Sequence, residues 1–187
     1  HASVFTGTTP EYHGIIGNGW FDKFINESVY CAGDATVEPI GTESGAGKMS
    51  PHRMKSTSFA DENRLYTQMK GKTIGIALKD RGAILPAGHT ANAAYWFHGQ
   101  DEAKWITSSY YVDELPEWVQ EFNNSDKAKS YLKIWEPLKD IKSYTQSGLD
   151  ENNFEFGFDG KETATFPYDL KALAAENGQF DLIKATP

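Results

Sequence analysis

The sequence predicts an α/β fold built on a mixed or parallel sheet. Residues 58–70 have the pattern of a helix, and the short apolar run at 73–78 follows them directly. A helix followed by a buried strand is the alternation that indicates a parallel sheet. The 187 residues are 39% apolar and 13% aromatic, which suits one packed domain and argues against disorder.

The N-terminal part is expected to alternate short structured pieces with turns. Residues 20–25 and 28–31 flank Asn26 and Glu27, which is typical of a hairpin. Residues 32–52 contain four glycines and two prolines without periodicity, so we expect a long surface loop there.

The helix and strand at the centre of the prediction have clear boundaries. Ser58 starts a helix that is expected to reach Lys70, where Gly71 ends it. Its inner face is expected to carry Leu65 and Met69. The apolar run at 73–78 predicts a central strand, buried on both faces of the sheet.

The remaining elements are less regular. Strands are predicted at 93–97 and 104–107, and a further strand at 154–158. Helices are predicted at about 113–122, 126–135 and 169–177.

Composition excludes several classes of function. The net charge is −8 and no Lys/Arg-rich block is present, so duplex nucleic acid is not expected as a partner. No stretch approaches the ~18 apolar residues that span a bilayer, so no membrane partner is expected. Cys31 is the only cysteine, which excludes a disulfide or a cysteine-rich zinc site within the chain. The start at His1 and the end at Pro187 suggest a processed or truncated piece of a longer protein.

Three apparent motifs do not match their full patterns. Residues 41–50 resemble a phosphate-binding P-loop, but Thr42 and Met49 break the pattern. Residues 14–19 carry the glycines of a dinucleotide motif in reversed order. The five histidines lack metal-ligand spacing, so no metal ligand is assigned.

Lys79 and Arg81 are the first candidate site residues. They follow the predicted buried strand directly, and ligands of open α/β sheets bind beyond the carboxyl ends of strands. On an extended chain both side chains share one face while Asp80 points away, which would suit a phosphate or carboxylate. The alternative is a solvated strand end.

Asn18 is the other candidate. It lies between Gly17 and Gly19, where a tight turn with positive φ would explain it. An asparagine amide that donates to an anion would explain it equally well. The spacing alone leaves both explanations open.

The stretches HASVFTGTTP at 1–10 and HGIIGNGW at 13–20 carry a resemblance to a known family. Further matching stretches lie at 78–84, 88–89, 94–97, 105–111, 115–119 and 165–168. In their order they resemble bacterial PafA-type alkaline phosphatases. These belong to the alkaline phosphatase superfamily, beside the nucleotide pyrophosphatases and phosphodiesterases. The resemblance covers most of the chain.

The resemblance implies one partial alkaline-phosphatase-like domain over 1–187. About 1–98 would form core and hairpin elements, and about 99–187 an inserted α+β cap region. It also implies a zinc-dependent phosphate monoester hydrolase, in which a threonine nucleophile attacks phosphorus and two zinc ions assist. Asn18, Lys79 and Arg81 match the positions that contact the phosphoryl oxygens.

By the same resemblance, the threonine would lie before His1, and the zinc ligands before His1 or after Pro187. The chain is therefore expected to bind no zinc of its own and to be inactive alone. The parent enzyme is expected to act on small phosphate esters and to be periplasmic or exported.

Two alternatives stay open. One is a fragment of a type I phosphodiesterase or nucleotide pyrophosphatase. The other is a non-enzymatic glycan-binding module, which an exposed, coplanar row of Trp96, Trp105 and Trp118 would support.

Overall fold

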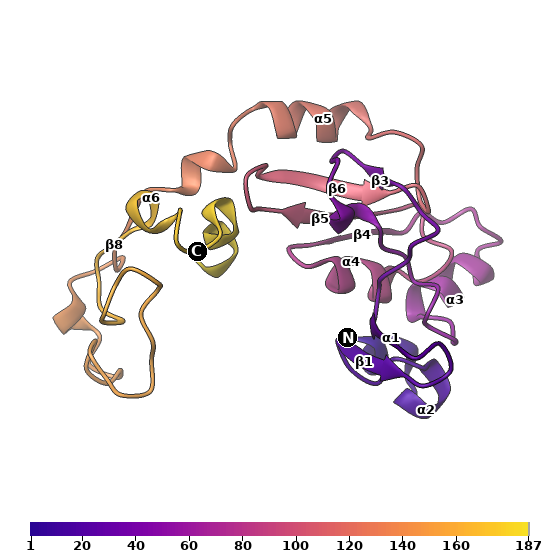
Figure 1. The fold of residues 1–187 in the computed structure, drawn as a ribbon, viewed down its shortest axis with the longest axis horizontal. Helices are drawn as coiled ribbons and strands as arrows, with labels where there is room; N and C mark the ends of the chain where they lie inside the picture. Colours follow the sequence, from indigo (N-terminus) through magenta and orange to yellow (C-terminus); the bar gives the residue numbers. More distant parts are fainter. Residues whose placement is uncertain (187) are drawn as a thin grey trace. The chain divides into compact units, whose positions relative to one another are not determined.

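The structure is a computed structural model that describes residues 1–186. The chain divides into two compact units (Figure 1). The first unit comprises 1–98 and 104–120, and the second comprises 99–103 and 121–187. Within the described residues, no helix is both long and apolar enough to cross a membrane.

A four-stranded mixed sheet forms the centre of the first unit. Its strands are β3 (Pro39–Ile40), β6 (Lys104–Ser108), β5 (Ala93–His98) and β4 (Ile74–Ala77), in that spatial order. β4 runs parallel to β5, whereas β6 is antiparallel to both β5 and β3. The predicted α/β class with a mixed sheet is confirmed.

One face of the sheet is covered by α4 (Asp80–Ala87), which connects β4 to β5. Ile84 and Leu85 of this helix pack with Ala94, Trp96 and Ile106 of the sheet in the main core. The other face carries Ala93 and Tyr95, which pack with Leu115 and with Val119 of α5 (Glu117–Asn124). The packing of α4 against β4 and β5 fixes the residues that follow β4.

The strand predicted at 73–78 exists, but its expected position is wrong. β4 is an edge strand of the sheet, and Ile74 and Ile76 are 51% and 58% exposed. Gly75 and Ala77 alternate with them and are partly buried, toward α4. A continuous apolar run therefore marks a strand here, but not one buried on both faces.

The predicted helix after Ser58 is shorter than expected. α3 (Phe59–Tyr66) starts with a capping box between Ser58 and Asp61. It ends before Lys70 because Gln68 and Met69 adopt positive φ values of 52° and 61°. The inner-face prediction is wrong, since Leu65 and Met69 are both about half exposed.

The hairpin near the N-terminus is confirmed. Two short helices, α1 (Ala2–Thr6) and α2 (Pro10–His13), come first. β1 (Gly19–Asp22) then pairs with β2 (Glu27–Tyr30) in an antiparallel ladder.

Residues 32–52 are not a surface loop. They contain β3 and the 3₁₀ turn η1 (Gly45–Gly47), and Ala32 and Ser50 are fully buried. The Trp96 indole N–H donates to the Ala46 carbonyl at 3.0 Å, which ties this segment to the sheet.

The second unit has little regular structure. It contains η2 (Lys129–Tyr131), β7 (Ile134–Trp135), η3 (Ile141–Ser143), β8 (Tyr168–Asp169), α6 (Leu170–Leu173) and η4 (Gln179–Ala185). The predicted helices at 126–135 and 169–177 are therefore largely wrong, and 154–158 forms no strand. Four side chains form its small core: Tyr168, Leu170, Leu173 and Leu182.

Candidate functional site

Lys79 and Arg81 lie at the junction of β4 and α4. Lys79 is the extended N-cap residue of α4, and Arg81 belongs to the first turn of the helix. The predicted i, i+2 pair on an extended chain is therefore wrong in its geometry. Lys79 is exposed, and 27% of the Arg81 side chain is exposed, so both cations reach solvent at the carboxyl end of β4.

Asp80 does not point away from Arg81 as expected. Tyr30 of β2 donates its hydroxyl proton to Asp80 Oδ1 at 2.7 Å, and Arg81 Nη1 donates to the same hydroxyl at 3.0 Å. The backbone N–H of Arg81 also donates to Asp80 Oδ1, at 2.7 Å. Asp80 and Arg81 both lie in the first turn of α4, so both side chains contact Tyr30 of β2.

The electrostatics of this network favour the protonated forms of Tyr30 and Arg81. Burial raises the pKa of the Tyr30 hydroxyl, and the bond to Asp80 raises it further. The bond to Tyr30 raises the pKa of the Arg81 guanidinium. Tyr30 therefore remains a proton donor and Arg81 a cation over the physiological pH range.

The hairpin brings Asn18 to the end of β2 that carries Tyr30. The Asn18 carbonyl accepts a bond from the Cys31 N–H at 2.8 Å, and Gly19 lies directly opposite Tyr30 in the ladder. Asn18 is exposed, and its φ is not positive. A left-handed turn therefore does not explain the asparagine, although it had been one of the two explanations from sequence. That its amide reaches the same ligand as Lys79 and Arg81 stays a prediction.

Tyr30 was missed by the sequence analysis. It is separated from Arg81 by 51 positions, and its strand alternation gave no sign of a contact with α4. The aromatic residue at the end of a hairpin, close to Asn18, was the available signal.

Two histidines of the first unit, His13 and His89, contact other groups of the fold. His13 accepts a bond from the Ile15 N–H at Nδ1, and its Nε2 lies 2.9 Å from Ser3 Oγ. His89 Nε2 lies 2.7 Å from the Met54 carbonyl oxygen. Because Nδ1 of His13 accepts one bond and its Nε2 lies against the Ser3 hydroxyl, neither ring nitrogen of His13 is available to a metal ion.

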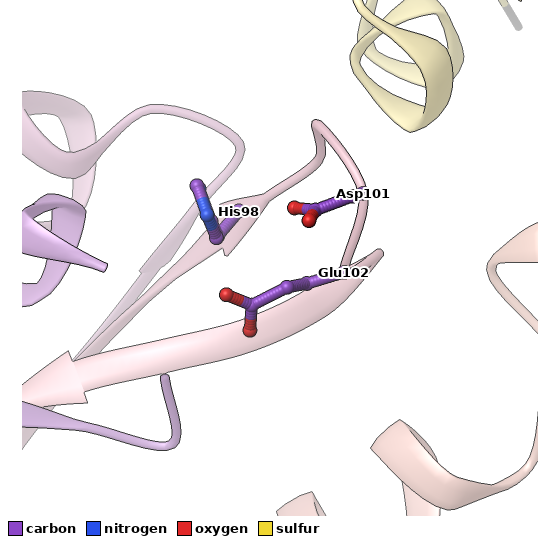
Figure 2. A group of neighbouring side chains, drawn as sticks. All are labelled: His98, Asp101 and Glu102. Carbon is purple, nitrogen blue, oxygen red and sulfur yellow. The ribbon is translucent and has the colours of Figure 1, made fainter. Parts of the chain in front are cut away.

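A group that the histidine spacing did not indicate lies at the turn between β5 and β6 (Figure 2). Figure 2 shows His98 at the end of β5, with Asp101 and Glu102 on the following turn. Their potential ligand atoms lie within 4.8 Å of one another, and no other such group occurs among residues 1–186. The tight turn alone brings these neighbours together, so the group by itself assigns no metal.

The tryptophan row required for glycan binding does not form. Trp96 is 3% exposed and bonded to Ala46, so its ring offers no platform. Trp118 is exposed, but it packs edge-on against Tyr95 at 5.4 Å between ring centroids.

A comparison with protein-family models shows to which family the chain belongs. The family described as type I phosphodiesterase / nucleotide pyrophosphatase matches residues 1–170. The chain belongs to this family. Its fold and its length are consistent with a part of a larger family member, as the relatives below indicate.

Three curated relatives of this phosphodiesterase-family chain cover nearly all of it. It is 45% identical over 191 residues to alkaline phosphatase PafA of Elizabethkingia meningoseptica. It is 43% identical over 188 residues to a protein of Myroides odoratus named calcium-transporting ATPase. It is 41% identical over 178 residues to alkaline phosphatase PhoV of Synechococcus elongatus. The matches cover 95–100% of this chain but only 32–34% of the relatives, so the chain spans about a third of their length.

A solved structure supports the fold independently. A crystal structure of an alkaline phosphatase PafA variant matches 96% of this chain and 34% of its own, with a TM-score of 0.87 and 41% identity. In that variant a threonine is replaced by serine, and an asparagine, a lysine and an arginine by alanine. Its lysine and arginine are two positions apart, as Lys79 and Arg81 are here.

Proposed function

We propose that this chain supplies the phosphoryl-binding part of a phosphate monoester hydrolase. Lys79 and Arg81 would neutralise the non-bridging oxygens of the phosphoryl group, and the Asn18 amide would donate to one of them. The chain spans about a third of its relatives, so the activity belongs to the whole enzyme and not to this part.

One observation carries the proposal: Arg81 is held in place without being fully neutralised. Its Nη1 donates to the neutral Tyr30 hydroxyl, while the nearest Asp80 oxygen is 3.9 Å away. A guanidinium fixed in this way keeps donor groups for a ligand, and guanidinium groups bind phosphate through paired N–H bonds. Lys79 adds a second cation at the same strand end.

The names of the relatives are consistent with this chemistry. Two of them are alkaline phosphatases, and the name of the third, calcium-transporting ATPase, implies hydrolysis of a phosphate bond. The asparagine, lysine and arginine replaced in the solved variant are the same three residue types. These parallels support Asn18, Lys79 and Arg81 as one phosphoryl site.

Zinc and export remain part of the proposal through the family resemblance alone. His13 is engaged by Ser3 and Ile15, and the one group of three potential metal ligands among the described residues lies at the turn between β5 and β6. We therefore derive no step through the metal. An exported or periplasmic enzyme that acts on small phosphate esters is the setting we propose.

A phosphodiesterase is the second candidate, because the matching family carries that name. The two candidates differ in charge. A monoester dianion carries one more negative charge than a diester, so it gains more from two cations at its non-bridging oxygens.

The test uses the whole enzyme that contains this chain, with Arg81→Ala compared on an aryl phosphate and a diaryl phosphate. Loss of a bond to a charged group costs about 1.5–3 kcal/mol, so monoester kcat/KM should fall by about 10- to 150-fold. Diester kcat/KM should fall much less. Equal losses on both substrates would contradict the monoesterase assignment.

A further inference from the structure

Tyr30 occupies an unusual place between two charged side chains of α4. Its hydroxyl donates to Asp80 Oδ1 at 2.7 Å and accepts from Arg81 Nη1 at 3.0 Å. The direct distance from Arg81 Nη1 to the same aspartate oxygen is 3.9 Å. The hydroxyl therefore mediates between the two charges, which do not form a direct hydrogen bond.

Without the Tyr30 hydroxyl between them, the Arg81 guanidinium and the Asp80 carboxylate would form a direct ion pair. Arginine and carboxylate prefer paired N–H···O bonds, which would consume the donor groups that a phosphoryl oxygen needs. Here Asp80 Oδ1 is already engaged by the Tyr30 hydroxyl and by the Arg81 backbone N–H. Asp80 Oδ1 thus accepts two hydrogen bonds from other groups, and the guanidinium donates to a neutral oxygen instead.

Tyr30 is also firmly placed. It ends β2, opposite Gly19 in the hairpin ladder, and its ring packs against the main core of the first unit. The same ladder carries Asn18 next to Gly19. Tyr30 thus connects the turn that holds Asn18 with the helix turn that holds Arg81.

We propose that Tyr30 is a positioning residue, whose hydroxyl keeps the Arg81 guanidinium off Asp80 and available to the phosphoryl group of the substrate. The inference rests on the proposed function, because it requires Arg81 to bind that group. Burial raises the pKa of Tyr30, which keeps its hydroxyl protonated and able to donate to Asp80.

The experiment is a double-mutant cycle in the whole enzyme, with an aryl phosphate as substrate. Tyr30→Phe keeps the ring and removes the hydroxyl, and it should lower kcat/KM on the order of tenfold. In the Arg81→Ala background the same change should alter kcat/KM less than about twofold, because its target is gone. Tyr66→Phe, an exposed tyrosine of α3, is the matched control and should leave kcat/KM unchanged.

A rescue variant separates positioning from a loss of packing. In Tyr30→Phe/Asp80→Asn the neutral amide no longer attracts Arg81 strongly, so at least about threefold of the lost activity should return. All assays are run well below the lowest melting temperature of the set, so that every variant is compared in its folded state.

The outcomes distinguish the two proposals. If Arg81→Ala lowers kcat/KM but Tyr30→Phe does not, the positioning role is overturned and the phosphoryl site stands. Equal effects of Tyr30→Phe in both backgrounds, or no rescue by Asp80→Asn, would also overturn the positioning role. If Arg81→Ala itself has no effect, the proposed function falls, and this inference with it.

Discussion

Gly75→Ala tests the close packing that places Lys79 and Arg81. Gly75 lies in β4 against α4, and an added Cβ would meet the Ala83 carbonyl oxygen and lie 2.9 Å from Ala87 Cβ. Ordinary van der Waals contact for such an atom begins near 3.4 Å, so the overlap is about 0.5 Å with Ala87 and larger with the backbone oxygen.

The cost of this overlap follows from what can move. A flexible side chain could turn away, but the helix backbone cannot, so α4 and β4 must move apart at the residues that precede Lys79 and Arg81. Overpacking of this kind costs about 1–3 kcal/mol, and contact with backbone favours the upper end. For a chain of this size, ~3 kcal/mol corresponds to a drop in melting temperature of about 6–12 °C.

The assay is thermal and urea unfolding of Gly75→Ala beside Gly45→Ala. Gly45 has no atom within 4 Å of an added Cβ and no positive φ, so Gly45→Ala should change the melting temperature little. In the whole enzyme, Gly75→Ala should also weaken binding of inorganic phosphate, because the shift of α4 carries Arg81 with it. Equal melting temperatures for the two variants would refute the packing argument.

Three further predictions concern stability and reactivity. Burial raises the pKa of the Asp61 carboxyl, but bonds from Ser58 and Thr90 outweigh it and hold the pKa below its usual value. The free energy of unfolding should therefore decrease as the pH falls below about 4. In Asp61→Asn this decrease should be smaller, and an equal dependence on pH in the two proteins would contradict the prediction. Ile76→Asp should cost less than about 1 kcal/mol in the isolated chain, because the side chain is half exposed; a loss of several kcal/mol would make β4 a central strand. Burial raises the pKa of the Cys31 thiol, so a thiol reagent at pH 8 should modify it slowly in the folded chain and faster in urea. Equal rates of modification in the folded and the unfolded chain would contradict its burial.

The local features of the fold were predictable from the sequence. The capping box at Ser58 and Asp61, the hairpin around Asn26 and the strand at 73–78 all depend on neighbouring residues, and all three exist. Their local chemistry does not depend on the rest of the structure, which is why a single sequence reveals them.

Several of the errors involve contacts between residues that are far apart in the sequence. An apolar run cannot tell an edge strand from a central one, so β4 was misplaced. The glycines of 32–52 suggested a loop, whereas the Ala46 carbonyl accepts a hydrogen bond from the Trp96 indole of the sheet. For the site, Lys79 and Arg81 follow the strand end as predicted, but the contact of Tyr30 with Arg81 depends on tertiary structure alone.

The central claim is that Asn18, Lys79 and Arg81 bind one phosphoryl group. The most direct measurement is a crystal structure of the whole enzyme with bound inorganic phosphate. We expect one phosphate with the Asn18 amide, Lys79 Nζ and the Arg81 guanidinium each at about 3 Å from its oxygens. The Tyr30 hydroxyl should still be hydrogen-bonded to Arg81. A phosphate bound without Arg81, or Asn18 more than about 10 Å from the Arg81 guanidinium, would contradict the claim.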